Sequence, residues 1–159
     1  MHKEETRPTP IVLEPIATVK NEITEAGMRR WKEIVSEIVF NPGFESAMDG
    51  LDDFSHIIVL FWMHRSPAWN KSMSKTRPQR RQDLPLVGVF STRSPVRPNP
   101  LGIAAVKLLE RRGSILKVIG LDAIDGTPVV DIKAYLPSDA VAQYSVPGWV
   151  HKLHHPDTN

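Results

Sequence analysis

Two arginines in a proline-rich stretch have the chemistry to bind a carboxylate or a phosphate. Arg93 and Arg97 flank Pro95, and the stretch continues through Pro98-Asn99-Pro100 to Gly102. A guanidinium presents its N–H donors in a planar fork that matches these anions. Prolines reduce the freedom that a loop would lose on binding. The stretch is therefore expected to present an anion-binding site, unless its arginines only pair with acidic residues elsewhere in the chain.

A second segment supplies carboxylates at the expected end of a strand. Asp125-Gly126 is typical of a hairpin turn, and this explains both residues without any ligand. The turn does not require Asp122, which lies three residues earlier. Either aspartate could accept hydrogen bonds from a ribose diol or an ammonium group, and the sequence leaves the choice between them open.

A third segment joins an apolar run to a basic one. The apolar run from Ile57 to Met63 ends at His64-Arg65, and from His64 to Pro98 the chain has eight basic residues and one acid, Asp83. This part has a net charge of +7, although the whole chain carries only +2. Such a local positive potential attracts polyanions. Charge alone leaves a nucleic-acid surface and an ordinary solvated loop equally open.

Composition excludes several other kinds of protein. The 159 residues include no cysteine, which excludes disulfides and thiolate metal sites, and neither a GxGxxG nor a P-loop motif is present. His151, His154 and His155 lack further ligands at suitable spacing, so no metal site is expected. The longest apolar stretch is seven residues and the N-terminus MHKEETRPTP is charged, so we expect a cytoplasmic protein without a membrane span.

Short runs rich in β-branched residues, separated by turn signals, predict a mainly-β fold, either a barrel or a sandwich. A short helix is expected over Glu45–Phe54, and Leu101–Glu110 is assigned as a strand although its composition also suits a helix. The proline-rich part from Pro67 to Pro100 is expected to be a long basic loop around one strand. The expected strands are Ile11–Lys20, Ile34–Phe40, His56–His64, Leu86–Ser91, Ser114–Leu121 and Val129–Tyr135.

The length fits one domain with short tails. We expect a flexible N-terminal tail over Met1–Pro10, a domain over residues 11–149 and a flexible C-terminal tail over residues 150–159.

Three stretches together resemble the TsaA/TrmO family of S-adenosylmethionine-dependent tRNA methyltransferases. They read DGLDDFSHIIVLFWMHR, GVFSTRSPVRPNPLGI and LDAIDGTPVVDIKAYLP, in this order. The resemblance implies a small β-barrel rather than a Rossmann sheet, and a homodimer that binds S-adenosylmethionine in a cleft completed by the second subunit. It also implies methylation of N6 of the threonylcarbamoyl-adenosine beside the anticodon of tRNA.

By position, the resemblance assigns cofactor contacts to several segments. Where relatives often have a Pro-Arg-Gln triplet, this chain has Met28, Arg29 and Arg30. The other implied contacts are His64, Arg65, Arg93, Ile103, Asp122, Ala123, Ile124 and Asp125.

We expect Arg93 to bind the methionine carboxylate and one of the two aspartates to bind the ribose hydroxyls or the ammonium group. The basic loop is expected to contact tRNA phosphates. Its predicted RNA-binding residues are Lys71, Lys75, Arg77, Arg80, Arg81 and Arg97. Longer relatives have a further C-terminal domain, so two alternatives remain: a regulatory protein that only binds S-adenosylmethionine, or a methyltransferase for another acceptor.

Overall fold

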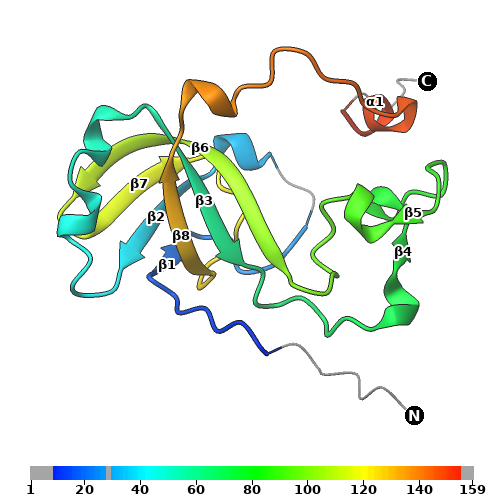
Figure 1. Cartoon of the computed structure of the whole chain (residues 1–159), viewed down its shortest axis with the longest axis horizontal. Helices are drawn as coiled ribbons and strands as arrows, with labels where there is room; N and C mark the ends of the chain where they lie inside the picture. Colours follow the sequence, from blue (N-terminus) through cyan, green and yellow to red (C-terminus); the bar gives the residue numbers. More distant parts are fainter. Residues whose placement is uncertain (1–8, 28–29, 155–159) are drawn as a thin grey trace, which may run out of the picture.

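Six antiparallel strands of this chain close into a barrel (Figure 1). The structure is a computed structural model that describes residues 9–27 and 30–154. Around the barrel the strands follow the order β1, β2, β7, β6, β3, β8. Their bounds are Ala17–Lys20 (β1), Val35–Phe40 (β2), His56–Trp62 (β3), Leu101–Arg112 (β6), Ile115–Ile119 (β7) and Pro128–Ala134 (β8). The predicted mainly-β fold is confirmed, and it is a barrel rather than a sandwich.

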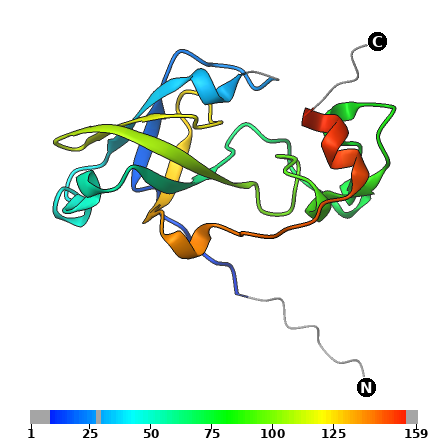
Figure 2. The same ribbon diagram turned by 90° about the horizontal axis from the view of Figure 1, so that it is seen from above.

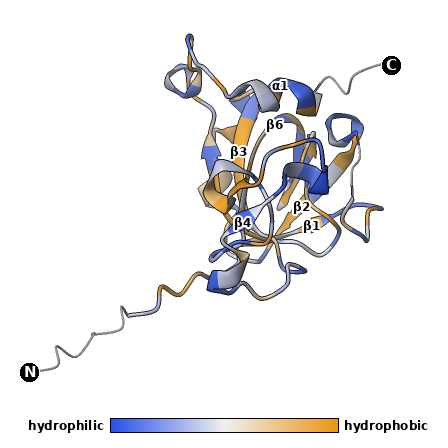
Figure 3. Cartoon of the chain, turned by 90° about the vertical axis from the view of Figure 1, so that its right-hand side faces the viewer, coloured by the Kyte–Doolittle hydropathy of each residue, from blue (hydrophilic) through white to orange (hydrophobic). Residues whose placement is uncertain are grey.

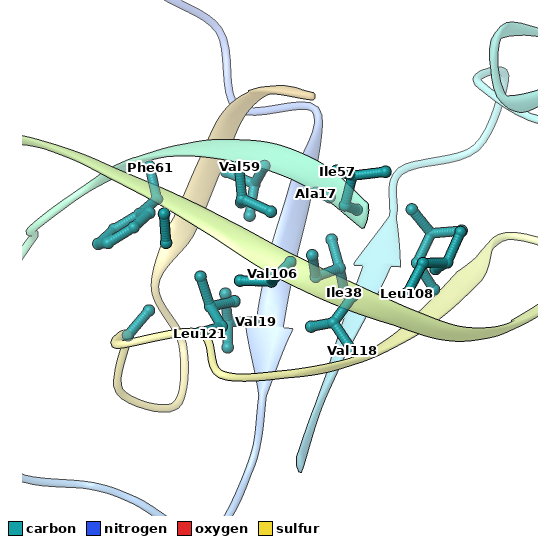
Figure 4. Packing of buried hydrophobic residues seen from close by; sticks show 14 of the residues in the cluster. Ala17, Val19, Ile38, Ile57, Val59, Phe61, Val106, Leu108, Val118 and Leu121 are labelled. Atoms are coloured by element: carbon teal, nitrogen blue, oxygen red, sulfur yellow. The ribbon is translucent and has the colours of Figure 1, made fainter. Parts of the chain in front are cut away.

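Side chains from alternate positions of the strands fill the barrel interior. Ile57, Val59 and Phe61 of β3 are at most 2% exposed, and Val106 of β6 meets them from the neighbouring strand (Figure 4). Figure 3 shows β3 as one of the strands in which hydrophobic residues are concentrated. This two-residue period is the pattern of a strand with one buried face.

Strand β6 confirms the assignment of Leu101–Glu110 as a strand. The segment forms a strand despite its residues of high helix propensity, because its backbone pairs with β3 on one side and β7 on the other. A register shift between Leu108 and Glu110 marks a bulge, which increases local twist and lets this long strand curve around the barrel. The first expected strand is shorter than predicted: β1 begins only after Pro15.

The segment between β3 and β6 is more ordered than the long loop around one strand that the sequence suggested. It contains a two-stranded sheet, and the predicted strand Leu86–Ser91 is reduced to two residues of this sheet, followed by a helical turn. The turn forms because the carbonyl of Val89 accepts the N–H and the hydroxyl of Thr92. The elements are β4 (Lys75–Thr76), β5 (Val87–Gly88) and 3-10 helices at Lys71–Met73, Pro78–Arg80 and Val89–Ser91.

Two expectations outside the barrel differ from the structure. The predicted helix Glu45–Phe54 is two 3-10 helices, Ser46–Met48 and Leu51–Asp53, because Gly50 between them has a positive φ of 81° that no right-handed helix continues through. The expected C-terminal tail is helical at its start: α1 spans Gly148–His154. The remaining 3-10 helices are Trp31–Glu33 and Pro137–Asp139. No helix within residues 9–27 and 30–154 is long and apolar enough to cross a membrane.

Gly102 of β6 packs so closely against the core that a side chain at this position would force a shift. It pairs with Phe61, and a Cβ added to Gly102 would overlap the Phe61 ring. We expect Gly102→Ala to lower the free energy of unfolding by about 1–3 kcal/mol, because a close-packed core must shift to accept an extra methyl group.

Gly88→Ala is the matched control for this substitution. Its φ of −60° suits alanine, and its added Cβ meets no atom within 4 Å. Urea denaturation followed by tryptophan fluorescence compares the two variants. Equal free energies of unfolding would contradict the packing described for Gly102.

Candidate functional site

The connections that carry the implied cofactor contacts meet at one end of the barrel. Every neighbouring strand pair is antiparallel, so β1, β3 and β7 end where β2, β6 and β8 begin. The connections 21–34, 63–100 and 120–127 therefore lie at the same end, which we call the site end. Residues far apart in the sequence are brought together there by the topology.

Arg93 and Asp122 come from two of these connections and act on each other electrostatically. Asp122 is exposed as a whole residue, but partial desolvation of its carboxyl is the largest effect on it and raises its pKa above the usual value. A backbone hydrogen bond and the positive charge of Arg93 act in the opposite direction. Arg93 is exposed and makes no hydrogen bond or ion pair with any described residue. Its guanidinium is therefore available to an anion near the Asp122 carboxylate.

Asn21 holds two of the connections together, and the sequence analysis did not single it out. Its side-chain N–H groups donate to Ser36 Oγ and to the carbonyl of Ala123, both at 2.9 Å. Its Oδ1 accepts the N–H of Ile23 at 2.9 Å. The last bond is an Asx turn, and an asparagine directly after a strand is the signal that could have revealed it.

Asp125 belongs to the same network and therefore has a structural task. Its Oδ1 accepts the N–H of Asn21 at 3.2 Å, and its own N–H donates to the carbonyl of Ile23 at 2.7 Å. Gly126 has a φ of 76°, as the expected turn requires. Of the two aspartates that the sequence left open, Asp125 is held in this backbone network, and Asp122 lies in the electrostatic field of Arg93.

The other implied contacts in this region present different groups to the site. Ala123 and Ile124 are 4% and 8% exposed, so their side chains point into the core and only their backbone could meet a ligand. Ile103 is 51% exposed and pairs with Leu60 in the neighbouring strand. Its side chain stands on the outer wall of the barrel.

Arg65 connects the end of β3 to the first of the three connections. Its Nη1 donates to the carbonyl of Thr24 at 2.6 Å. Burial, and secondly the charge of Arg65, lower the pKa of His64, so its imidazole is neutral at pH 7. Ser66 follows, and its hydroxyl is buried without a partner among the described residues.

Three implied contacts lie in the connection 21–34. Met28 and Arg29 fall outside the described residues. Arg30 is exposed and forms an ion pair with Glu33 at 3.5 Å. The structure therefore gives no geometry that links this triplet to Arg93.

The six predicted RNA-binding residues divide into two groups. Lys71, Lys75 and Arg80 are exposed. Arg77, Arg81 and Arg97 are half-buried, and each donates to backbone carbonyls of the chain itself. Arg97 illustrates this role: its Nε and Nη2 donate to the carbonyls of Ser94 and Thr92 at 2.8 and 2.6 Å.

The C-terminal helix lies beside the basic segment in both ribbon views (Figures 1 and 2). Arg81 joins the two, because it binds Asp83 at 2.6 Å and donates to the carbonyl of Lys152 at 2.9 Å. The side-chain hydrogen bond from Arg81 is the largest effect lowering the pKa of Asp83, and Lys152 adds to it. Lys152 is exposed, so α1 adds a cation to the basic surface. The sequence analysis had predicted this surface only in the loop between β3 and β6.

No other part of the described chain offers comparable chemistry. Within residues 9–27 and 30–154 no group of three histidine, aspartate or glutamate residues could hold a metal ion. An apolar hollow on the barrel wall has no charged group that would bind a charged ligand. Its lining residues are Ile11, Leu13, Pro15, Trp62, Pro128 and Val130.

We expect Asn21→Ala to lower the free energy of unfolding by about 2 kcal/mol, because three hydrogen bonds are lost and Ser36, 1% exposed, loses its partner. Asn41→Ala removes a single exposed hydrogen bond to the carbonyl of Pro15 and serves as the control. Thermal unfolding by circular dichroism measures both. A melting temperature for Asn21→Ala equal to that of Asn41→Ala would contradict the central role of Asn21.

Comparisons with known proteins agree with this fold. A crystal structure of TrmO from Pseudomonas aeruginosa superimposes with a TM-score of 0.73 at 29% identity, covering 91% of this chain and 64% of the other. An Archaeoglobus fulgidus protein named S-adenosyl-L-methionine-binding protein is 39% identical over 140 residues, which cover 84% of this chain and 96% of that relative. The tRNA (adenine(37)-N6)-methyltransferase of Escherichia coli is 44% identical over 110 residues, 62% of this chain.

The shares covered in the relatives differ widely. This chain spans 46% of the E. coli methyltransferase and 31% of a second A. fulgidus protein that is 46% identical to it. The family model of the tRNA-methyltransferase O N-terminal domain matches residues 18–140. This range contains all three connections of the site end and, apart from Ala17, all six strands of the barrel. The chain therefore belongs to the TsaA/TrmO family, through this N-terminal domain.

Proposed function

We propose that this chain is a cytoplasmic S-adenosylmethionine-dependent methyltransferase that methylates N6 of the threonylcarbamoyl-adenosine beside the anticodon of tRNA. The observation that carries the proposal is the exposed guanidinium of Arg93, which has no partner in the described chain and acts on the carboxyl of Asp122 at the site end. Family membership supports the chemistry, since the E. coli relative is named tRNA (adenine(37)-N6)-methyltransferase.

The residues at the site end fit the polar groups of S-adenosylmethionine. This cofactor has a carboxylate, an ammonium group and a ribose diol. Arg93 would bind the carboxylate, and Asp122 would accept from the ammonium group or the ribose. The buried hydroxyl of Ser66, which has no partner among the described residues, offers one further polar contact.

The remaining proposed contacts act through other groups. His64 would contribute a neutral imidazole, and Ala123 and Ile124 would contribute backbone groups because their side chains are buried. Arg65 and Asp125 would position the site, since both bind the connection 21–34. Met28, Arg29 and Arg30 stay in the proposal on the family correspondence alone.

When bound, S-adenosylmethionine supplies a methyl group on a positively charged sulfur that an acceptor nitrogen can displace in line. The chain's own task is to orient the two reactants and exclude water between them. A strong base is not required, because the N6–H of a carbamoylated adenine is more acidic than that of a free amino group. Arg93 and Asp122 would serve this task by holding the donor.

We also propose that the active form is a homodimer. Strand β6 carries three exposed apolar side chains. Leu101 and Ile103 lie beside the site end and Leu109 lies further along the strand, with exposed fractions of 37%, 51% and 43%. Exposed apolar side chains gathered on one strand are typical of surfaces that contact another protein. A second subunit on this wall would lie next to Ile103 and so close to the proposed cofactor.

The RNA contact is proposed for the exposed cations of the basic segment and α1. Lys71, Lys75, Arg80 and Lys152 point into solvent and are free to approach phosphates. Arg77, Arg81 and Arg97 support this surface from inside, because their guanidinium groups bind backbone carbonyls.

The purified chain, incubated with S-adenosylmethionine and threonylcarbamoylated tRNA, tests the function directly. We expect nucleoside mass spectrometry to show one added methyl group on threonylcarbamoyl-adenosine. Loss of this methyl group from the tRNA of a deletion strain would be the matching result in cells. Absence of methylation by a chain that still binds S-adenosylmethionine would favour a binding protein instead, as the name of the A. fulgidus relative suggests.

We expect Arg93→Ala to weaken S-adenosylmethionine binding by about tenfold or more, because a charge-assisted hydrogen bond contributes roughly 1.5–3 kcal/mol. Arg112→Ala is the control, since Arg112 is exposed, pairs with Glu110 and lies at the far end of β6. Isothermal titration calorimetry measures both dissociation constants. An unchanged constant for Arg93→Ala would remove Arg93 from the site.

We expect the triple variant Lys71→Ala, Lys75→Ala and Arg80→Ala to bind tRNA more weakly than wild type. Each lost phosphate contact should also reduce the slope of log K against log salt by about 1. The control is Lys107→Ala with Arg112→Ala, because Lys107 pairs with His56 at the other end of the barrel. Fluorescence anisotropy over a salt series measures the slopes, and equal slopes for the two variants would exclude this surface.

A further inference from the structure

Phe90 is an aromatic residue that the fold leaves in solvent. Its exposed fraction is 81%, although neighbouring Val89 is only 3% exposed. Phe90 lies three residues before Arg93, in the same connection of the site end. Nothing in the sequence analysis gave this ring a function.

The backbone that presents Phe90 is firmly held. The N–H of Val89 donates to the carbonyl of Ser74 at 2.9 Å, and the carbonyl of Val89 accepts the Thr92 hydroxyl at 2.8 Å. Arg97 binds the carbonyl of Thr92 at 2.6 Å. The ring is therefore exposed on an ordered loop, and a ligand that covers it would remove little conformational freedom.

The surroundings of Phe90 are cationic. Lys75 is exposed and pairs with Gly88 across the small sheet of β4 and β5, and Gly88 lies two residues before Phe90. Arg93 follows on the other side along the chain. An exposed ring on a surface that also carries exposed cations suits single-stranded nucleic acid, because bases stack on the ring and phosphates meet the cations.

We propose that Phe90 is a stacking platform for an unpaired base of the RNA substrate, next to the bound methyl donor. The inference rests on the proposed function, since it requires an RNA acceptor at the site end. Stacking on Phe90 fixes the plane of the base, and the position of Phe90 near Arg93 brings that base within the same site. Phe90 thereby acts in substrate positioning, while Arg93 holds the cofactor.

Three substitutions at Phe90 separate stacking from simple apolar contact. Phe90→Ala removes the ring, Phe90→Leu keeps an apolar side chain without a flat face, and Phe90→Tyr keeps the ring. Tyr144→Ala is the control, because Tyr144 is 80% exposed in a stretch without charged residues from Ala140 to Val150. Circular dichroism confirms that each variant is folded before it is compared.

We expect Phe90→Ala and Phe90→Leu to raise the dissociation constant for an anticodon stem-loop RNA, and the KM for tRNA, by between about fivefold and 150-fold. Phe90→Tyr and Tyr144→Ala should resemble wild type, and calorimetry should show unchanged S-adenosylmethionine affinity in all four variants.

If the wild-type protein methylates tRNA, three results would overturn the inference about Phe90. They are wild-type RNA affinity in Phe90→Ala, a loss of S-adenosylmethionine affinity in Phe90→Ala, and a lower sedimentation mass in Phe90→Ala, which would make the ring part of a subunit interface. Wild-type protein that neither binds nor methylates tRNA would instead reject the proposed function, and the inference with it.

Discussion

Closure of the antiparallel barrel is the constraint on which the site depends. In a closed sheet each strand is paired on both sides, so no edge is left open and alternate connections must emerge at the same end. This places Arg93 and Asp122 in one electrostatic environment although they come from separate connections. Asn21 then holds the first connection to the third, because its side chain donates to the carbonyl of Ala123 and its backbone N–H donates to Asp125. The barrel brings the three connections together, and Asn21 fixes the first against the third.

Two arginines that flank one proline have different tasks because of what lies within their reach. The guanidinium of Arg97 donates hydrogen bonds to carbonyls of its own loop, whereas that of Arg93 donates to no carbonyl among the described residues. The loop that Arg97 holds is the one that presents Arg93 and Phe90. Rigidity in this loop matters for binding, because a group that is already ordered loses less entropy when a ligand arrives.

The sequence was sufficient for the elements whose pattern is local. The apolar run rich in β-branched residues identified β3, and Asp125-Gly126 identified its turn, because both signals depend on neighbouring residues. The run that forms β6 was ambiguous, since its pairing partners decide its structure. The tasks of Asn21 and Arg97 and the helix α1 depend on contacts between distant segments, and no local pattern reports them. Convergence of the site residues was expected only through family resemblance.

The basic segment shows why charge in a sequence overstates charge available to a partner. Half of its six predicted RNA-binding residues hold backbone carbonyls, and Arg81 also neutralises Asp83, the only acid between His64 and Pro98. Removing such an arginine would weaken the proposed RNA binding by disordering the segment, even if the arginine never met a phosphate. Substitutions of the exposed cations avoid this ambiguity, because these side chains do not hold the segment together. The exposed cations are Lys71, Lys75, Arg80 and Lys152. A salt dependence measured on them therefore separates the charge that folds the segment from the charge that binds.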